Sequence, residues 1–110
     1  WSAEGGVAAA ARLATDHREA TAVFTSSDQQ AIGLIAGLQD TGRTIPGDLA
    51  LASFDGSPEA AYTVPPLTTV SVPLAAMAAD AVAEILERTA RSHQHPTTLV
   101  LRRSCGCPTE

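Results

Sequence analysis

The alternation of apolar runs with a helical segment between residues 21 and 54 constrains the fold of this chain more than any other feature. The run TAVFTS, residues 21–26, is short, β-branched and apolar, and it predicts a buried strand. The run LALASF, residues 49–54, predicts a second strand, of the kind that is covered on both faces. Between them, residues 27–42 read as a helix, with apolar side chains on one stripe, a capping box of Ser27 and Gln30 at the start and a glycine at the end. Strand, helix and strand in this order predict a parallel crossover and an α/β fold.

The flanking segments extend this pattern. Ser2 is a candidate N-cap for a helix over residues 4–17. Residues 67–72 form a third strand-like run bounded by prolines, and residues 74–90 carry a long apolar helical stripe. A last β-rich run covers residues 97–104. We therefore expect one Rossmann-like parallel sheet with flanking helices.

Composition excludes several classes of function. The net charge is −5, and the seven Lys and Arg residues are scattered, so this segment lacks the basic surface of a nucleic-acid-binding domain. No apolar run reaches the length of a membrane span, and no basic segment followed by an apolar one begins the chain. These observations predict a soluble, intracellular protein located in the cytoplasm, without a membrane partner.

Cysteine and histidine residues near the carboxyl end form the closest approach to a metal-binding motif. Cys105 and Cys107 are separated by one residue, which is too short for an ordinary structural disulfide, and we expect two reduced thiols rather than a metal site or a redox pair. His93 and His95 precede them, and in a polar loop they are expected to be solvated. We predict no metal and no cofactor.

Two acidic residues follow the predicted strands. Asp28 comes after the first strand and Asp55 after the second, and in open parallel sheets ligands bind beyond the carboxyl ends of the strands. A carboxylate there accepts hydrogen bonds from the hydroxyls of a sugar or the N–H groups of a base. Each residue has a structural alternative: Asp28 suits the first turn of a helix, and Asp55, followed by glycine, suits a turn.

Trp1 is the only tryptophan and precedes the first predicted helix, so it either stacks on a ligand ring in the same crevice or is a frayed terminal residue. The chain has no Ser-His-Asp or Cys-His set and no glycine-rich phosphate loop. The sequence therefore favours a binding protein over an enzyme.

Four stretches in collinear order carry a family resemblance: WSAEGG, AVFTSSDQQAIGLIAGLQDTGRTIPGDLALASFDG, PPLTTVSVPLAAMAADAVAEIL and LVLRRSCG. Together they resemble the carboxyl-terminal part of lactose- and galactose-repressor-type transcription factors, the LacI/GalR family. The resemblance implies part of an effector-binding core with the periplasmic-binding-protein type I fold, in which two Rossmann-like lobes enclose a small ligand. It also implies a transcription repressor that responds to a sugar-like or nucleoside-like effector. A periplasmic sugar-binding protein of a transport system, which shares the fold, is the alternative.

The resemblance also assigns roles to single residues. Asp55 matches the acid that contacts the effector, and Trp1 matches an aromatic residue that packs on it. Ser27 stands where many relatives have an effector-binding asparagine, and Val72 stands where some sugar-binding relatives have glutamine. With Asp28 at the neighbouring strand end, the candidate ligand-binding residues are Trp1, Ser27, Asp28 and Asp55.

By resemblance, residues 1–70 and 97–104 belong to the carboxyl-terminal lobe, and the helix over residues 74–90 belongs to the amino-terminal lobe. The DNA-binding headpiece and most of the first lobe are absent from the chain, so this helix is expected to leave an apolar stripe uncovered, in a fragment or in a swapped assembly. Operator DNA would be bound only through the missing headpiece. Family homodimers imply that Ile32, Ile35 and residues around Tyr62 form an interface rather than core.

Overall fold

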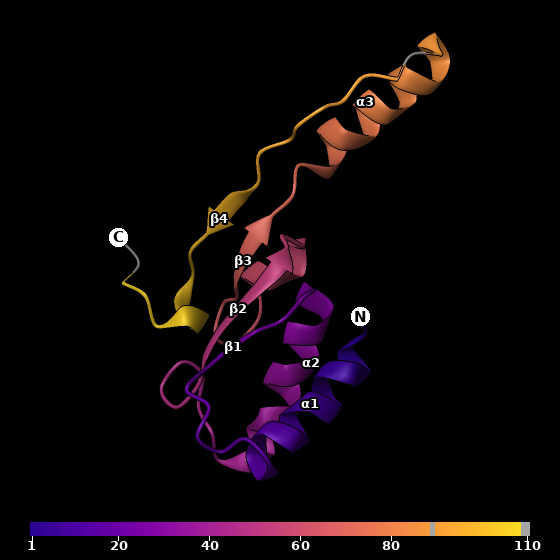
Figure 1. Cartoon of the computed structure of the whole chain (residues 1–110). Helices are drawn as coiled ribbons and strands as arrows, with labels where there is room; N and C mark the ends of the chain where they lie inside the picture. Colours follow the sequence, from indigo (N-terminus) through magenta and orange to yellow (C-terminus); the bar gives the residue numbers. More distant parts are fainter. Residues whose placement is uncertain (89, 109–110) are drawn as a thin grey trace.

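The computed structural model describes residues 1–88 and 90–108. It contains three α-helices, four strands and three short 3₁₀ helices (Figure 1) among these residues. In chain order they are α1 (Ala3–Thr15), β1 (Ala22–Phe24), α2 (Asp28–Leu38), η1 (Gln39–Thr41), β2 (Ala50–Asp55), η2 (Pro58–Ala61), β3 (Thr68–Ser71), α3 (Leu74–Glu87), β4 (Thr98–Val100) and η3 (Arg103–Cys105). In the described part of the chain, no helix combines the length and apolar character that a membrane span requires. The predicted α/β fold is confirmed.

The sheet has the strand order β1-β2-β3-β4. β1 pairs with β2 and β2 pairs with β3 in parallel, whereas β4 pairs antiparallel with β3. The prediction of a buried first strand is wrong, because β1 lies at the edge of the described sheet and Phe24 is 61% exposed. The second strand alternates instead of being covered on both faces: Leu51 and Ser53 are buried, whereas Ala50, Ala52 and Phe54 are half-buried.

The two helices α1 and α2 pack against each other with their backbones in close approach. A Cβ atom built on Gly6 would lie 2.1 Å from the carbonyl oxygen of Gln30, and one built on Gly33 would lie 1.8 Å from that of Ala3. No side chain fits at either position, so glycine is required at both. The contact places the amino ends of both helices at the same end of the helix pair, beside the carboxyl ends of β1 and β2 (Figure 1).

Leucines of α2, β2 and the segment before β3 form most of the core. The buried apolar side chains are those of Ala10, Ala31, Leu34, Ile35, Leu38, Leu49, Leu51, Ala60 and Leu67. Ile35 therefore belongs to the core of the chain, in contrast to the interface role expected for it. Ile32 is half-buried.

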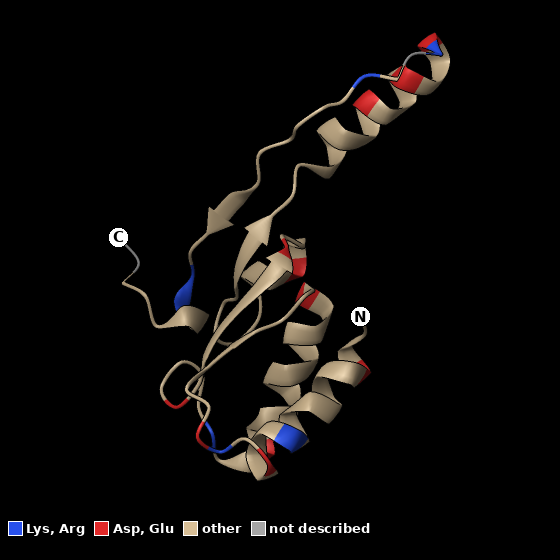
Figure 2. Cartoon of the chain, viewed as in Figure 1, with Lys and Arg blue, Asp and Glu red and all other residues tan. Residues whose placement is uncertain are grey.

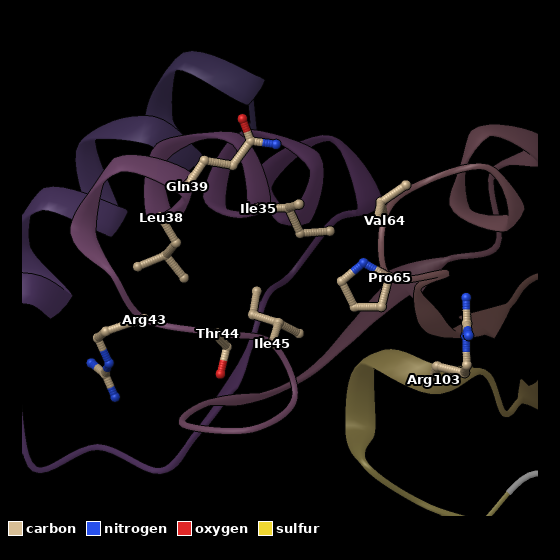
Figure 3. Close-up of a pocket in the computed structure, with 9 residues that line it drawn as sticks. All are labelled: Ile35, Leu38, Gln39, Arg43, Thr44, Ile45, Val64, Pro65 and Arg103. Atoms are coloured by element: carbon tan, nitrogen blue, oxygen red, sulfur yellow. The ribbon is translucent and has the colours of Figure 1, made fainter.

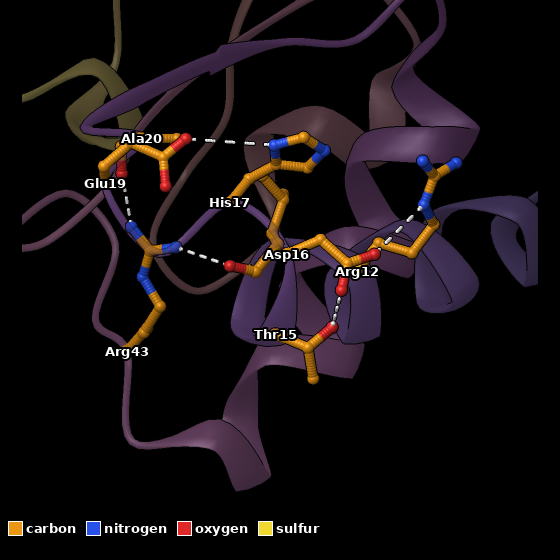
Figure 4. Close-up of polar contacts among 8 residues, drawn as sticks. Arg12, Thr15, Asp16, His17, Glu19, Ala20 and Arg43 are labelled. Carbon is orange, nitrogen blue, oxygen red and sulfur yellow. Dashed lines mark hydrogen bonds and ion pairs between the residues drawn. The ribbon is translucent and has the colours of Figure 1, made fainter.

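Arg43 fixes the connection between α1 and β1 at the opposite end of the sheet. Its guanidinium donates one hydrogen bond to the carbonyl oxygen of Leu13, at 3.1 Å, and another to that of Ala20 (Figure 4). An exposed ion pair between Arg12 and Asp16, at 3.9 Å, closes the last turn of α1 in the same region. Because Arg43 holds two carbonyl groups that helix and strand leave free, it orders a loop that has few apolar contacts.

Helix α3 projects away from the rest of the molecule (Figure 1). None of its residues is buried, and Ile85 and Leu86 are 75% and 76% exposed. The molecule measures 55 × 32 × 22 Å along its principal axes. The expected uncovered apolar stripe is therefore present. It belongs to a helix that ends at Glu87, three residues before the predicted end, and is followed by Arg88 in a left-handed conformation.

Candidate ligand-binding site

The carboxyl ends of β1, β2 and β3 meet the amino ends of α1 and α2, and this junction gathers the polar residues of the candidate site. Figure 2 shows acidic positions at the end of β2 and at the start of α2, whereas the basic positions lie on other segments. The two residues predicted to lie at one edge of the sheet, Asp28 and Asp55, are both at this junction. Their placement confirms the prediction that both acids follow parallel strands at the same end.

Asp28 is the first residue of α2 and is only 1% exposed. Its Oδ1 accepts a hydrogen bond from the hydroxyl of Thr69 at 2.7 Å, and its Oδ2 accepts one from the backbone N–H of Ser57 at 2.6 Å. The same carboxylate lies where the dipole of α2 favours negative charge. Asp28 thus joins α2, the loop after β2 and strand β3, and both of its oxygens are already engaged within the protein.

Asp55 is the last residue of β2 and is exposed. Its backbone has φ = 119°, a conformation that L-residues other than glycine rarely adopt. Its carbonyl oxygen accepts a hydrogen bond from the N–H of Val72 at 3.2 Å, which holds this strained backbone against β3. The arrangement presents a carboxylate to solvent from a fixed backbone, as a residue that contacts a ligand requires.

A second polar network lies beneath these acids and was not identified from the sequence. The hydroxyl of Thr25 donates to the hydroxyl of Ser53 at 3.0 Å, which links the ends of β1 and β2. The N–H of Gly56 donates to the hydroxyl of Thr69 at 3.3 Å, so this hydroxyl serves both the loop and Asp28. The presence of Ser and Thr in and beside the predicted strands could have indicated this network, because hydroxyl groups require hydrogen-bond partners when they are buried.

Ser27 and Trp1, the two remaining candidates, occupy different surroundings. Ser27 is buried as the N-cap of α2, and its hydroxyl accepts a hydrogen bond from the N–H of Gln30 at 3.3 Å. The side-chain oxygen of Gln30 accepts a hydrogen bond from the hydroxyl of Ser26 at 2.7 Å instead of one from the backbone N–H of Ser27. Only half of the predicted capping box therefore forms. Trp1 is 81% exposed ahead of α1 and takes no part in the described hydrogen-bond network around Asp28. The structure therefore brings Ser27, Asp28 and Asp55 to one end and leaves the indole in solvent.

One cavity reaches this site and another lies at the opposite end of the sheet. A cavity of about 310 Å³ runs between α1 and β1 and reaches the site at Thr25 and Ser26. A larger apolar cavity of about 410 Å³ lies at the other end of the sheet, between Ile35, Ile45, Pro65 and Arg103 (Figure 3). We place the candidate site at the first of these ends, because it holds the carboxylates and hydroxyls that would recognise a polar ligand.

The histidines before β4 form ion pairs with α3, while His93 remains exposed, as expected, and His95 is half-buried. Nε2 of His93 lies 2.9 Å from Glu84, and its Nδ1 lies 3.4 Å from Asp80. His95 lies 3.3 Å from Asp80. The hydrogen bond with Glu84 raises the pKa of His93. These contacts hold the segment after α3 against the helix, and no metal-binding group of three such side chains occurs among the described residues.

The domain described as "Periplasmic binding protein-like domain" matches residues 1–105 of this chain. Among curated proteins, the chain is 43% identical over 91 residues to the HTH-type transcriptional repressor MelR of Bacillus subtilis, covering 78% of this chain and 26% of that protein. It is 37% identical over 102 residues to the ribose operon repressor of Haemophilus influenzae, covering 93% of this chain and 31% of that protein.

A solved structure shows the same relationship. A LacI family transcriptional regulator from Lactobacillus casei with bound glucose superimposes with a TM-score of 0.82 at 36% identity, covering 94% of this chain and 40% of that chain. The chain thus spans less than half of each of these proteins. All three are transcriptional regulators by description, and none is described as an enzyme.

Proposed function

We propose, because this chain belongs to the periplasmic binding protein-like domain family and its relatives are LacI-type regulators, that it is the effector-sensing part of a bacterial transcription repressor. The observation that carries the proposal is the exposed carboxylate of Asp55 on a strained backbone at the carboxyl end of β2. Fold alone hosts many functions, so the assignment rests on this site together with the family.

The effector we propose is a small sugar-like or nucleoside-like molecule. A carboxylate accepts hydrogen bonds from the vicinal hydroxyls that both classes carry. Asp55 is free for this role, whereas Asp28 is engaged with Thr69 and Ser57 and supports the loop that carries Asp55. The glucose bound to the Lactobacillus casei regulator supports a carbohydrate. Ser27 and Trp1 complete the proposed site, the first from the start of α2 and the second from the segment before α1.

Signal transfer to DNA requires a second lobe and a DNA-binding domain. We propose that residues 1–70 and 97–104 form the carboxyl-terminal lobe and that α3 belongs to the amino-terminal lobe. The isolation of α3, with Ile85 and Leu86 in solvent, supports this division, because a helix with such a stripe needs an apolar partner. An effector bound between the lobes would favour one lobe arrangement only if it bound that arrangement more tightly.

We also propose that the regulator acts as a homodimer in the cytoplasm. The loop between η2 and β3 exposes Tyr62 by 84% and Val64 by 81%, and Val64 lines a cavity together with Ile35 of α2. Exposed large apolar side chains grouped on one loop favour an interface. The site offers binding groups and no activated nucleophile, so the protein is proposed to be a regulator rather than an enzyme.

Calorimetric titration of the natural protein that contains this chain tests the proposal. The ligands are glucose, ribose, a disaccharide and a nucleoside, each added with and without the DNA that precedes the gene. We expect saturable binding of one class and a change in DNA affinity when that ligand is present. Tight binding of a ligand with no effect on DNA, or turnover of the ligand, contradicts the proposal.

A further inference from the structure

The two thiols at the carboxyl end lie on an anchored segment. Cys105 is the last residue of η3, and Cys107 follows after one glycine. The preceding Ser104 is fully buried: its hydroxyl donates to the carbonyl oxygen of Leu51 at 2.6 Å and accepts from the N–H of Thr68 at 2.8 Å. Through Ser104, β2 and β3 both hold η3, so the first thiol has a defined position.

The chain turns back on itself between the two cysteines. Gly106 has φ = 70°, in the left-handed region that favours glycine. This turn allows the N–H of Cys107 to donate to Sγ of Cys105 at 3.3 Å, and the thiol of Cys107 to donate to the carbonyl oxygen of Cys105 at 3.9 Å. Both thiols are free, Cys105 half-buried and Cys107 exposed.

The surroundings make the two thiols unequal acids. Burial alone would raise the pKa of Cys105, but hydrogen bonds from the side chain of Cys107, from Thr68 and from the N–H of Cys107 outweigh burial and lower it. The same interaction with Cys105 raises the pKa of Cys107. The first proton therefore leaves Cys105, whose thiolate the neighbouring donors stabilise. A low-pKa thiol next to a second thiol is the arrangement of a nucleophile and its resolving partner.

Contrary to the unreactive pair of thiols expected from their spacing alone, we propose that Cys105 and Cys107 form a redox-active dithiol, in which hydrogen peroxide oxidises Cys105 and Cys107 resolves the product to an intrachain disulfide. The pair lies on η3 and the turn that follows it, rather than on the segments that carry Asp28 and Asp55, so it is a modification site separate from the proposed effector site.

The reaction balances with hydrogen peroxide as the oxidant. The Cys105 thiolate attacks one peroxide oxygen, the O–O bond breaks, and an S–O bond forms, giving a sulfenic acid and one molecule of water after proton uptake. Cys107 then loses its proton and attacks Sγ of Cys105. The S–O bond breaks, an S–S bond forms, and a second water leaves with that proton. Two thiols and one hydrogen peroxide thus give one disulfide and two waters.

The ring closed by such a disulfide contains only one intervening residue. A disulfide that departs from relaxed geometry is more easily reduced, so the oxidised pair should return to thiols in the presence of dithiothreitol or glutathione. The pair therefore suits a reversible modification and not a permanent crosslink.

The proposal can be tested on the 110-residue chain by oxidation with hydrogen peroxide, followed by alkylation with N-ethylmaleimide and intact mass spectrometry. We expect a product with the mass of a single chain, without an intermolecular disulfide and without an alkylated thiol, and we expect dithiothreitol to reverse the oxidation. In Cys107→Ser the remaining thiol should be trapped by dimedone as a sulfenic acid, and at pH 7 it should react at least about tenfold faster than the thiol of Cys105→Ser. Circular dichroism of both variants checks the fold.

The wild-type product decides the matter even if one variant fails to fold. Equal rates for the two single-cysteine variants would overturn the proposal. So would a wild-type product that is an intermolecular disulfide, or a pair of independently overoxidised sulfinic acids.

Discussion

Oδ1 of Asp28 lies 2.7 Å from the hydroxyl of Thr69, although 41 positions separate the two residues in the chain. With the Ser57 N–H on the other carboxylate oxygen, this contact ties the start of α2 to β3 and to the loop that follows Asp55. Asp28 is therefore a structural residue, whereas Asp55, which remains exposed, is the acid that is available to a ligand.

Replacement of Asp28 should destabilise the fold. Asp28→Ala leaves the Ser57 N–H and the Thr69 hydroxyl without their acceptor, and we expect a loss of about 2–4 kcal/mol in the free energy of unfolding. Asp28→Asn should lose less, because one carbonyl oxygen remains. Urea unfolding measures both variants beside Gln29→Ala, an exposed neighbour in the same turn. A wild-type midpoint for Asp28→Ala would refute the structural role.

Two adjacent glycines of α1 offer a matched test of the helix contact. Gly6→Ala pushes a Cβ atom to 2.1 Å from the Gln30 carbonyl oxygen and should cost about 2 kcal/mol or more. Gly5→Ala meets only the Ser2 hydroxyl, at 3.7 Å, and should be neutral or stabilise by roughly 0.5 kcal/mol through helix propensity. Thermal unfolding separates them. Equal melting temperatures would mean that α1 and α2 do not approach this closely.

Much of this fold was predictable from local pattern. Apolar patterns predicted the three α-helices and the four strands of the described residues but none of the three 3₁₀ helices, and the N-cap roles of Ser2 and Ser27 followed from residue type. The exposure of β1 was not predictable, because an apolar run indicates a strand without indicating which neighbours will cover it. The edge position of Phe24 depends on the sheet order, which is a property of the whole chain.

The candidate site, like the fold, was predictable from the sequence only in part. Position after a strand predicted that Asp28 and Asp55 would share one end of the sheet. It did not distinguish their roles, because the partners of Asp28 come from Ser57 and Thr69, far along the chain. Nor did it show that Gly6 and Gly33 permit the helix contact that sets this end, since a glycine in a helix otherwise reads as a local weakness.

Exposed apolar side chains on α3 should make the isolated chain self-associate. Burial of one such side chain is worth about 2 kcal/mol, so an uncovered helix gains by contact with another copy. Ile85→Glu should weaken the association, because that side chain is 75% exposed. Gln94→Glu adds the same charge at an exposed loop position and should have no effect. Sedimentation velocity at micromolar concentration compares the association of wild type and the two variants. A monomeric wild type would contradict the prediction.

The contact between His93 and α3 should depend on pH. The carboxylate of Glu84, helped by Asp80 and opposed by burial and by Arg91, raises the pKa of His93 above its ordinary value of 6.5. The stabilising contribution is therefore complete below the pKa of the unfolded chain and is lost as the pH rises through that of the folded chain. Nuclear magnetic resonance titration of the His93 ring reports the pKa, and exchange of the Arg91 N–H, which donates to Glu84 at 2.8 Å, reports release.

Glu84→Gln is the control for this titration. It should bring the pKa of His93 back toward its ordinary value and should abolish the pH dependence of exchange at Arg91. An unshifted His93 in the unmodified chain would show that the segment before β4 is not held on α3.

The strain at Asp55 predicts opposite effects on stability and on binding. Asp55→Gly relieves the backbone at φ = 119° and should raise the free energy of unfolding by about 1 kcal/mol. Chemical denaturation measures this gain, and Asp55→Asn, which keeps a branched polar side chain at the strained position, should show little of it. A loss of stability in Asp55→Gly would show that the carboxylate supports the fold.

Calorimetric titration of the intact regulator with its sugar or nucleoside, in wild type, Asp55→Ala and the exposed control Glu59→Ala, tests the central claim most directly. Loss of a charge-assisted hydrogen bond to the ligand should cost on the order of 2 kcal/mol, so Asp55→Ala should bind about thirtyfold more weakly, while Glu59→Ala binds as wild type does. Wild-type affinity in Asp55→Ala would contradict the assignment of this strand end as the effector site.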